Sequence, residues 1–206
     1  MSLAAKLPGY HVNDQFLSKR DRQELLAFCL QNDDMFSPAS VTTKSEKDGK
    51  LHGVVRPKIR KSSKAELPKT YEDKYSQLVK DELPKVVKSL GMSLPEHYNL
   101  ELECVAHGDG CFFARHIDTI TSKNSHARLI SAVYYFYQEP KPFTGGELRL
   151  YSIDGSVYQD IVPANNLIIF FPSIFPHEVL PVAEPSGEFA ASRFSINCWV
   201  RKDRSK

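Results

Sequence analysis

From residue 97 onward the chain is a series of short apolar or alternating segments separated by turn residues, and this spacing constrains the fold more than any other feature. The turns fall at "HGDG", "GG", "DG", "PANN" and "EPSG". Short strands at such regular intervals are typical of a sandwich or jelly roll. We therefore expect about eight strands, near residues 98–106, 111–118, 128–138, 146–151, 157–162, 166–171, 176–181 and 192–201.

Upstream of residue 97 the periodicity is helical instead. Apolar residues recur at helical spacing over 18–32, where Ser18 suits an N-cap, and over 71–90, where Gly91 suits a C-cap and Pro84 can introduce a kink. Between them, "MFSPASVTT" and "KLHGVVRPKIR" are expected to be short strands joined by a charged loop. The pattern predicts one mainly β, α+β domain over 1–206, with a jelly-roll core at 97–203 and a helical and strand elaboration at 1–96.

Length and composition fit a globular protein outside the membrane. A chain of 206 residues suits one domain, and 41% hydrophobic with 25% charged residues is a typical globular balance. Its apolar runs fall far short of the ~18 residues of a membrane-spanning helix, and the first residues lack the apolar stretch of a secretory signal. We therefore expect a cytoplasmic protein with no membrane partner.

Cysteine spacing and net charge argue against three other classes. Cys29, Cys104, Cys111 and Cys198 form no Cys-x-x-Cys pair, which argues against a disulfide framework and against a zinc ribbon. A net charge of +2 gives no general reason to expect nucleic acid as a partner. The basic run "RPKIRKSSK" is more simply a solvated loop than a phosphate site.

Within the β-rich part, "CFFARHIDT" places His116 and Asp118 two residues apart at the end of an expected strand. Residues i and i+2 of a strand point to the same face, so the imidazole and the carboxylate would lie side by side. A His-x-Asp tripeptide alone is a weak signal in a chain with seven histidines. As a pair on one face, the two side chains supply two of the three ligands of a facial triad.

The third ligand is expected to be a histidine from another strand. His177 follows the apolar run and Pro-containing turn of "LIIFFPSIFPHEVLPV", at the start of what we interpret as the return strand of a hairpin. The competitors, His107 in a Gly/Asp turn and His126 in the polar loop "TSKNSHAR", are more simply interpreted as surface residues. Two histidines and one carboxylate favour non-haem Fe(II) over zinc, because three ligands on one octahedral face leave three positions for substrates.

The C-terminal segment "SRFSINCWV" alternates polar and apolar residues, but its polar side is unusual for a solvent-facing surface. Arg193, Ser195, Asn197 and Trp199 share that side. If it lines the interior of a barrel, Arg193 is a buried cation that needs an anionic partner, and the segment itself carries no acid. A small dicarboxylate would supply that partner.

Four motifs, in this order, resemble the 2-oxoglutarate and Fe(II)-dependent oxygenases, and among them the prolyl 4-hydroxylase-like group. The motifs are "RHID", "AVYYFYQEPKPFTGGELRLY", "NNLIIFFPSIFPHEVLPV" and "SRFSINCWV". The resemblance covers residues 98–201 and implies a double-stranded β-helix of the jelly-roll, cupin-like type. Four ordered motifs are much more specific than a single His-x-Asp pair.

Carried over position by position, the resemblance implies a metal site next to a cosubstrate site. His116, Asp118 and His177 would bind Fe(II), and no catalytic residue beyond this metal site is expected. Arg193 would bind the far carboxylate of 2-oxoglutarate as a charge-assisted bidentate pair, which the planar guanidinium suits.

The resemblance also implies four further cosubstrate contacts. Tyr135 and Ser195 would donate their hydroxyl groups to the same carboxylate. Leu148 would pack against the cosubstrate, and Trp199 would form a wall of the pocket. Arg128, at the start of the strand that leads to Tyr135, is expected to be a residue of the rim.

The chain departs from the family pattern in two places. Many animal prolyl hydroxylases of this kind carry a tyrosine that contacts the cosubstrate ten residues before the first iron histidine, and this chain has Ala106 there. The segment "EVLPVAEPSGEFAAS" between His177 and Arg193 is longer than in those relatives, and we expect a hairpin that bulges from the rim.

The reaction that the resemblance implies is hydroxylation of an unactivated C–H bond, with O2 consumed, succinate and CO2 released, and ascorbate as an optional further cofactor. The expected substrate is a prolyl residue of a protein or peptide, under the loop "SEKDGKLHGVVRPKIRKSSK" as a lid. Two alternatives stay open. One is a hydroxylase of a free amino acid or small metabolite, and the other is a non-catalytic or zinc-binding jelly-roll protein. The sequence leaves the oligomeric state open.

Overall fold

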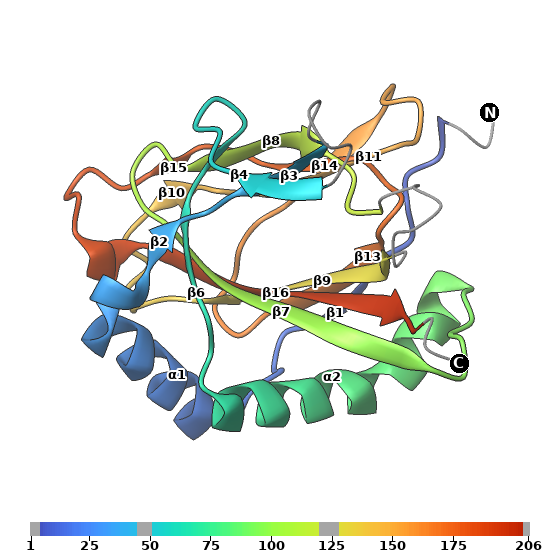
Figure 1. Cartoon of the computed structure of the whole chain (residues 1–206), viewed down its shortest axis with the longest axis horizontal. Helices are drawn as coiled ribbons and strands as arrows, with labels where there is room; N and C mark the ends of the chain where they lie inside the picture. Colours follow the sequence, from blue (N-terminus) through green and yellow to red (C-terminus); the bar gives the residue numbers. More distant parts are fainter. Residues whose placement is uncertain (1–4, 45–50, 120–127, 204–206) are drawn as a thin grey trace.

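The structure is a computed structural model that describes residues 5–44, 51–119 and 128–203. Two β-sheets face each other, and two helices cover the outer side of the larger sheet (Figure 1). This mainly β architecture is a double-stranded β-helix, the fold class that the sequence predicted. It brings the ends of strands from both sheets around one interior.

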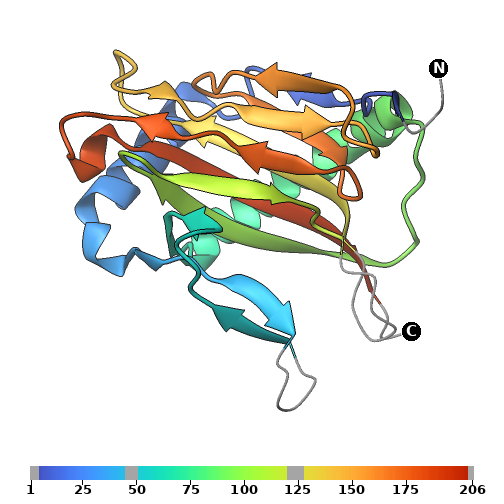
Figure 2. The same cartoon turned by 90° about the horizontal axis from the view of Figure 1, so that it is seen from above.

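Within the described ranges the larger sheet has seven strands and the smaller sheet five. The larger has the spatial order β1 (His11–Asn13), β13 (Ile168–Pro172), β9 (Arg128–Phe136), β16 (Arg193–Lys202), β7 (Tyr98–His107), β6 (Ser63–Ala65) and β2 (Ser37–Pro38). The smaller has the order β12 (Tyr158–Ile161), β11 (Leu148–Tyr151), β14 (His177–Val179), β8 (Phe112–His116) and β5 (Arg60–Lys61). Two-stranded pairs join β10 (Thr144–Gly145) to β15 (Val182–Ala183) and β3 (Val41–Lys44) to β4 (Leu51–Val54), and the second pair projects from the body (Figure 2).

Two helices lie where the sequence predicted them. α1 (Lys19–Gln31) begins after Ser18, whose side chain accepts a hydrogen bond from the Asp21 amide, as an N-cap does. α2 (Lys69–Leu90) continues past Pro84 and ends at Gly91, whose φ of 63° is the left-handed conformation that glycine adopts most easily. Short 3-10 turns lie at Asp33–Met35 and Phe189–Ala191. No helix in the described ranges combines the length and apolar character needed to cross a membrane.

The main apolar core lies between the larger sheet and the two helices. Alternate residues of β16 from Phe194 to Val200 belong to it, namely Phe194, Ile196, Cys198 and Val200, each at most 1% exposed. α2 contributes buried Val79, Leu83 and Val86 to the same core. Because side chains alternate along a strand, the intervening residues of β16 face the opposite way, into the space between the sheets.

Two expectations about connections need correction. His177 is not on the return strand of a hairpin, because β13 pairs with β1 and β9 in the larger sheet, whereas β14 pairs with β11 and β8 in the smaller. The turn before His177 therefore carries the chain from one sheet to the other. The segment between His177 and Arg193 is also more than a bulging hairpin, since β15 pairs with β10 and Glu184 is only 2% exposed.

Candidate metal centre

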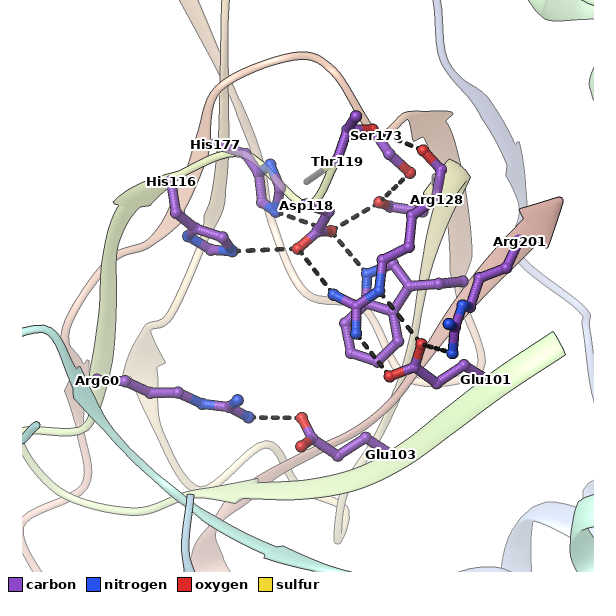
Figure 3. Close-up of polar contacts among 12 residues, drawn as sticks. Arg60, Glu101, Glu103, His116, Asp118, Thr119, Arg128, Ser173, His177 and Arg201 are labelled. Atoms are coloured by element: carbon purple, nitrogen blue, oxygen red, sulfur yellow. Dashed lines mark hydrogen bonds and ion pairs between the residues drawn. The ribbon is translucent and has the colours of Figure 1, made fainter. Parts of the chain in front are cut away.

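His116, Asp118 and His177 come together at one end of the smaller sheet. β8 ends at His116, β14 begins at His177, and these two histidines are directly opposite each other in the antiparallel pair. Asp118 follows shortly after β8, where its amide donates to the Ser173 carbonyl at 3.1 Å. One ligand atom from each of the three side chains lies within 4.8 Å of the others (Figure 3).

Backbone carbonyls fix the proton positions of both imidazoles. Nδ1 of His116 is 2.9 Å from the Ala114 oxygen, and Nδ1 of His177 is 3.0 Å from the Phe175 oxygen. A carbonyl oxygen only accepts, so each Nδ1 carries a hydrogen and each neutral ring keeps its lone pair on Nε2. The Nε2 atoms face Asp118, at 3.5 Å from Oδ1 for His116 and 3.3 Å from Oδ2 for His177. This tautomer is the one that binds a metal through Nε2.

The three groups shift one another's pKa values. Burial alone would raise the pKa of Asp118, but the adjacent His177 and His116 hold it well below its usual value. Burial and the charge of His177 lower the pKa of His116. Burial would also lower the pKa of His177, yet the Asp118 carboxylate raises it above the ordinary value. Asp118 is therefore ionised, as a metal ligand must be.

Side chains from the opposite sheet hold Asp118 in place. Its Oδ2 accepts hydrogen bonds from Ser131 Oγ on β9 at 2.7 Å and from Trp199 Nε1 on β16 at 2.8 Å. Ser131 is in turn 2.8 Å from Ser173 Oγ. These contacts occupy Oδ2 and leave Oδ1 on the side of His116, which sets the direction from which a metal would bind.

Arg128 lies closer to the centre than the rim position that the sequence predicted. Its guanidinium carbon is 3.7 Å from the centroid of the Trp199 ring, and one of its nitrogens is 3.7 Å from Asp118 Oδ1. Glu101 accepts from Arg128 at 2.6 and 3.3 Å and from Arg201 at 3.0 Å (Figure 3). No sequence pattern indicates this network, because Glu101 and Arg201 are brought together only by the pairing of β7 with β16.

A cavity joins the triad to Arg193. Leu148, Ser195 and Trp199 also line it. Arg193 is 1% exposed, and among the described residues it forms no ion pair, while its Nε and Nη2 atoms have no hydrogen-bond partner. The Ser195 hydroxyl is likewise buried and unpaired within that part of the chain. A buried cation without an acid is costly, so the cavity suits an anion.

Tyr135 contacts Arg193 directly. The guanidinium carbon is 4.7 Å from the centroid of the Tyr135 ring, and the hydroxyl is buried with no partner in the described ranges. Burial raises the pKa of Tyr135, so its hydroxyl keeps the proton and is able to donate it in a hydrogen bond.

The double-glycine turn makes room for the stem of Arg193. Gly146 has a φ of +70°, and a Cβ there would lie 2.7 Å from Arg193 Cδ and 2.9 Å from Val182 Cγ2. Gly145 has a φ of +72°, and a Cβ there would lie 2.3 Å from the Pro181 carbonyl oxygen. Both positions therefore require glycine, and Gly146 requires it because of Arg193.

The interpretation of His107 as a surface residue is wrong. The "HGDG" segment is a turn, but His107 is the last residue of β7, directly opposite Arg193, and only 3% exposed. The other competitor, His126, lies outside the described residues. Ala106, the first departure from the family pattern noted above, belongs to the core on the helix side of the sheet.

Arg60 also corrects an expectation, since the basic run that contains it is not simply a solvated loop. Arg60 lies on β5, is 7% exposed, lines the cavity and donates to Glu103 at 2.7 Å. Its guanidinium carbon is 5.0 Å from the ring centroid of Phe113, which stacks on His116 at 3.6 Å. The sequence signal was weak, because two residues of strand within a charged segment show no periodicity.

The donor set fits both a ferrous ion and a keto-diacid cosubstrate. Two imidazole nitrogens and one carboxylate oxygen converge within 4.8 Å of one another, the 2-His-1-carboxylate arrangement that suits non-haem Fe(II). The unpaired Nε and Nη2 atoms of Arg193 lie in the wall of the same cavity, where a carboxylate would satisfy them.

Comparison with known sequences agrees with this chemistry. Residues 102–201 match the model of the 2OG-Fe(II) oxygenase superfamily. The chain is 37% identical over 205 residues to an uncharacterized PKHD-type hydroxylase of Synechocystis sp., and the match covers 95% of this chain. It covers 64% of that relative, so this chain spans slightly less than two thirds of the relative's length.

Comparison with solved structures gives the same fold. A prolyl-4-hydroxylase of Pseudomonas putida is similar with a TM-score of 0.68 and 25% identity, over 95% of this chain and 94% of that chain. A prolyl hydroxylase of Trichoplax adhaerens, solved with a peptide fragment of the hypoxia inducible factor, is similar in fold with a TM-score of 0.68 and 22% identity, over 94% and 84% of the two chains.

Proposed function

We propose that this chain, whose residues 102–201 match the model of the 2OG-Fe(II) oxygenase superfamily, is an Fe(II)- and 2-oxoglutarate-dependent dioxygenase that hydroxylates an unactivated C–H bond. The observation that carries the proposal is the presence of two features in one cavity. One is the triad of His116, Asp118 and His177, and the other is the buried, unpaired guanidinium of Arg193. A jelly-roll protein that only binds a ligand would not need a metal triad and a buried, unpaired guanidinium in the same cavity.

In this proposal Fe(II), 2-oxoglutarate and O2 supply the oxidising power for hydroxylation, with succinate and CO2 as coproducts, and ascorbate is an auxiliary reductant. His116 and His177 would hold the iron through Nε2, because their Nδ1 atoms are committed to backbone carbonyls. Asp118 would hold it through the oxygen that Ser131 and Trp199 leave free. The residues thus fix three positions before the metal arrives, which lowers the reorganisation that binding requires.

Arg193 would fix the far carboxylate of the cosubstrate. Tyr135 and Ser195, with their unpaired hydroxyl groups beside it, would add neutral donors to the same carboxylate. Leu148 would pack against the aliphatic part, and Trp199 would form the wall beside the metal. Burial of these groups excludes water from the reacting end of the pocket and strengthens each charged contact.

We propose a prolyl residue of a protein or peptide as the target. The name of the Pseudomonas relative, a prolyl-4-hydroxylase, supports this choice. The shape of the surface supports an extended substrate too. One open hollow shares Trp199 with the cavity, and a second shares Arg60 with it, so the surface next to the cavity offers room for further residues of a substrate chain.

Anaerobic addition of Fe(II) and 2-oxoglutarate tests the cofactors. We expect a visible metal-to-ligand charge-transfer band, lost in His116→Ala and weakened in Arg193→Ala. His97→Ala, an exposed histidine before β7, is the matched control and is expected to keep the band. A zinc-binding or non-catalytic protein would give no band in the wild type, which would refute the proposal.

Substrate-stimulated formation of succinate tests the target class. We expect turnover with some members of a panel of proline-containing peptides, and little with free amino acids. Turnover with free amino acids alone would establish the metabolite alternative and end the peptide proposal, while leaving the cofactors in place.

A further inference from the structure

His107 is a buried side chain beside Arg193 to which the mechanism above gives no role. It is the last residue of β7, it lies directly opposite Arg193 across the pair with β16, and it lines the cavity. Partners across a strand pair point to the same face, so both side chains project into the space between the sheets. A histidine only 3% exposed next to a buried cation needs an explanation.

The hydrogen bond between the two side chains determines which nitrogen of His107 carries the proton. Arg193 Nη1 is 3.3 Å from His107 Nδ1, and a guanidinium only donates, so Nδ1 must be the acceptor. Burial, together with the charges of Arg193 and Arg60, lowers the pKa of His107 well below its ordinary value. The ring is therefore neutral, with its single hydrogen on Nε2.

That Nε2–H group is buried and has no acceptor among the described residues. Four other polar atoms around Arg193 share this condition, namely Arg193 Nε and Nη2, Tyr135 Oη and Ser195 Oγ. Each unpaired buried donor keeps the full cost of its lost hydration, so their concentration at one place points to a ligand rich in acceptors. A carboxylate, with two oxygens and about four lone-pair sites, is the smallest group that satisfies several of them at once.

We propose that His107 is a cosubstrate-binding residue, which donates a hydrogen bond through Nε2–H to the anionic cosubstrate bound in this cavity, while its Nδ1 orients the guanidinium. The inference rests on the proposed function, because that cosubstrate is 2-oxoglutarate. A neutral imidazole serves both neighbours, since it accepts from the cation and donates to the anion.

Binding of N-oxalylglycine, a non-reacting mimic of 2-oxoglutarate, to the Zn(II)-loaded protein measures the contribution of His107 without turnover. We expect the dissociation constant from calorimetry to rise about 10- to 100-fold in His107→Leu, as for a hydrogen bond to a charged group. His107→Gln, which keeps one acceptor and one donor, should recover most of the affinity. His97→Leu, an exposed histidine, is the matched control and should bind like the wild type.

A second readout separates direct contact from a purely structural role. In protein labelled with 15N-histidine and loaded with Zn(II), the resonances missing from His107→Gln identify His107. We expect the Nε2–H tautomer in the free protein and a downfield shift of that proton when N-oxalylglycine is added. A role limited to orienting Arg193 would leave the Nε2–H signal unmoved, and this result would overturn the inference even if affinity fell.

The outcomes also distinguish this inference from the proposed function. If the wild type binds N-oxalylglycine and His107→Leu binds it equally well, the role of His107 is refuted and the oxygenase proposal stands. If the wild type fails to bind the mimic at all, the proposed function fails, and the inference that depends on it fails too. A melting temperature for each variant identifies any loss of binding that follows from unfolding.

Discussion

The two faces of β16 are equally buried and chemically opposite. Phe194, Ile196 and Cys198 face the helices, whereas Arg193 and Ser195 face the space between the sheets, and none of these five is more than 1% exposed. Burial therefore does not distinguish the core from the site. The side chains of the strand itself do, since the cavity face of β16 carries the unpaired polar groups of Arg193 and Ser195, whereas the helix face carries apolar side chains.

The difference between the two faces of β16 shows that the cavity face lowers the stability of the free protein in order to bind an anion. On the helix face each side chain is stabilised as soon as the chain folds, because apolar area leaves water. On the cavity face the buried guanidinium and hydroxyl groups are stabilised only when an anion arrives. Substitutions on the two faces should therefore act on different quantities, and the following predictions test that separation.

The largest effect is expected for Arg193→Met on the cavity face. Losing the buried partner of a carboxylate should weaken 2-oxoglutarate binding by roughly 30-fold or more, because such losses are worth about 2–5 kcal/mol. The apo protein should be at least as stable as the wild type, since a buried unpaired cation is replaced by an apolar chain. Calorimetric binding and urea unfolding measure the two quantities, and a large loss of stability with unchanged affinity would reverse the comparison.

Phe194→Ala, one residue along β16, should do the opposite. It removes a fully buried ring that packs against Phe36, Phe136 and Phe189, so unfolding should become easier by about 3–5 kcal/mol. The affinity of the folded fraction for 2-oxoglutarate should change little, because the ring points away from the cavity. Should affinity fall as far as it does in Arg193→Met, the two faces would not be separable.

Trp199→Phe is expected to have the next largest effect, on metal affinity. The variant removes the Nε1 donor to Asp118 but keeps an aromatic ring beneath Arg128. Loss of one outer hydrogen bond to a ligand typically weakens metal binding about 10- to 100-fold. Competition with a metal chelator measures the effect, and Ser131→Ala, which removes the other donor to the same oxygen, should behave alike. Unchanged affinity in both variants would show that Asp118 needs no support.

Gly146→Ala should have the smallest effect on cosubstrate binding, and Gly91→Ala is its matched control. Both glycines have positive φ, so Gly91→Ala should lose on the order of 1 kcal/mol of stability, and Gly146→Ala should lose more because its Cβ also clashes with buried neighbours. A Cβ at Gly91 meets nothing within 4 Å, whereas one at Gly146 meets Arg193 Cδ at 2.7 Å. Only Gly146→Ala should therefore also weaken 2-oxoglutarate binding, by about 10-fold. Equal binding in the two variants would mean that Arg193 adjusts freely.

The sequence predicted the elements whose patterns are long. The helices near 18–32 and 71–90 correspond to α1 and α2, and each of the eight strands expected after residue 97 overlaps a strand of the structure. The alternation in "SRFSINCWV" correctly separated the two faces of β16, because ten residues of strand give a clear period. Short strands were harder to predict. β1 has three residues and β5 has two, too few for a periodicity to be visible.

Prediction from the sequence was least successful where the site depends on pairing between distant segments. Trp199 contacts Asp118 across 81 positions of sequence, and nothing in either motif predicts that contact. Because a Gly/Asp turn follows His107 directly, the sequence pattern did not show that His107 is the last residue of a strand. Counting alternate residues back along that strand puts His107 on the face of Glu101 and Glu103, and only the pairing of β7 with β16 puts it opposite Arg193.

A crystal structure with Mn(II) and N-oxalylglycine tests the central claim most directly. The account predicts that His116 Nε2, Asp118 and His177 Nε2 bind the manganese, and that the far carboxylate of the inhibitor lies against Arg193. Manganese bound away from this triad, or a carboxylate held without Arg193, would contradict it.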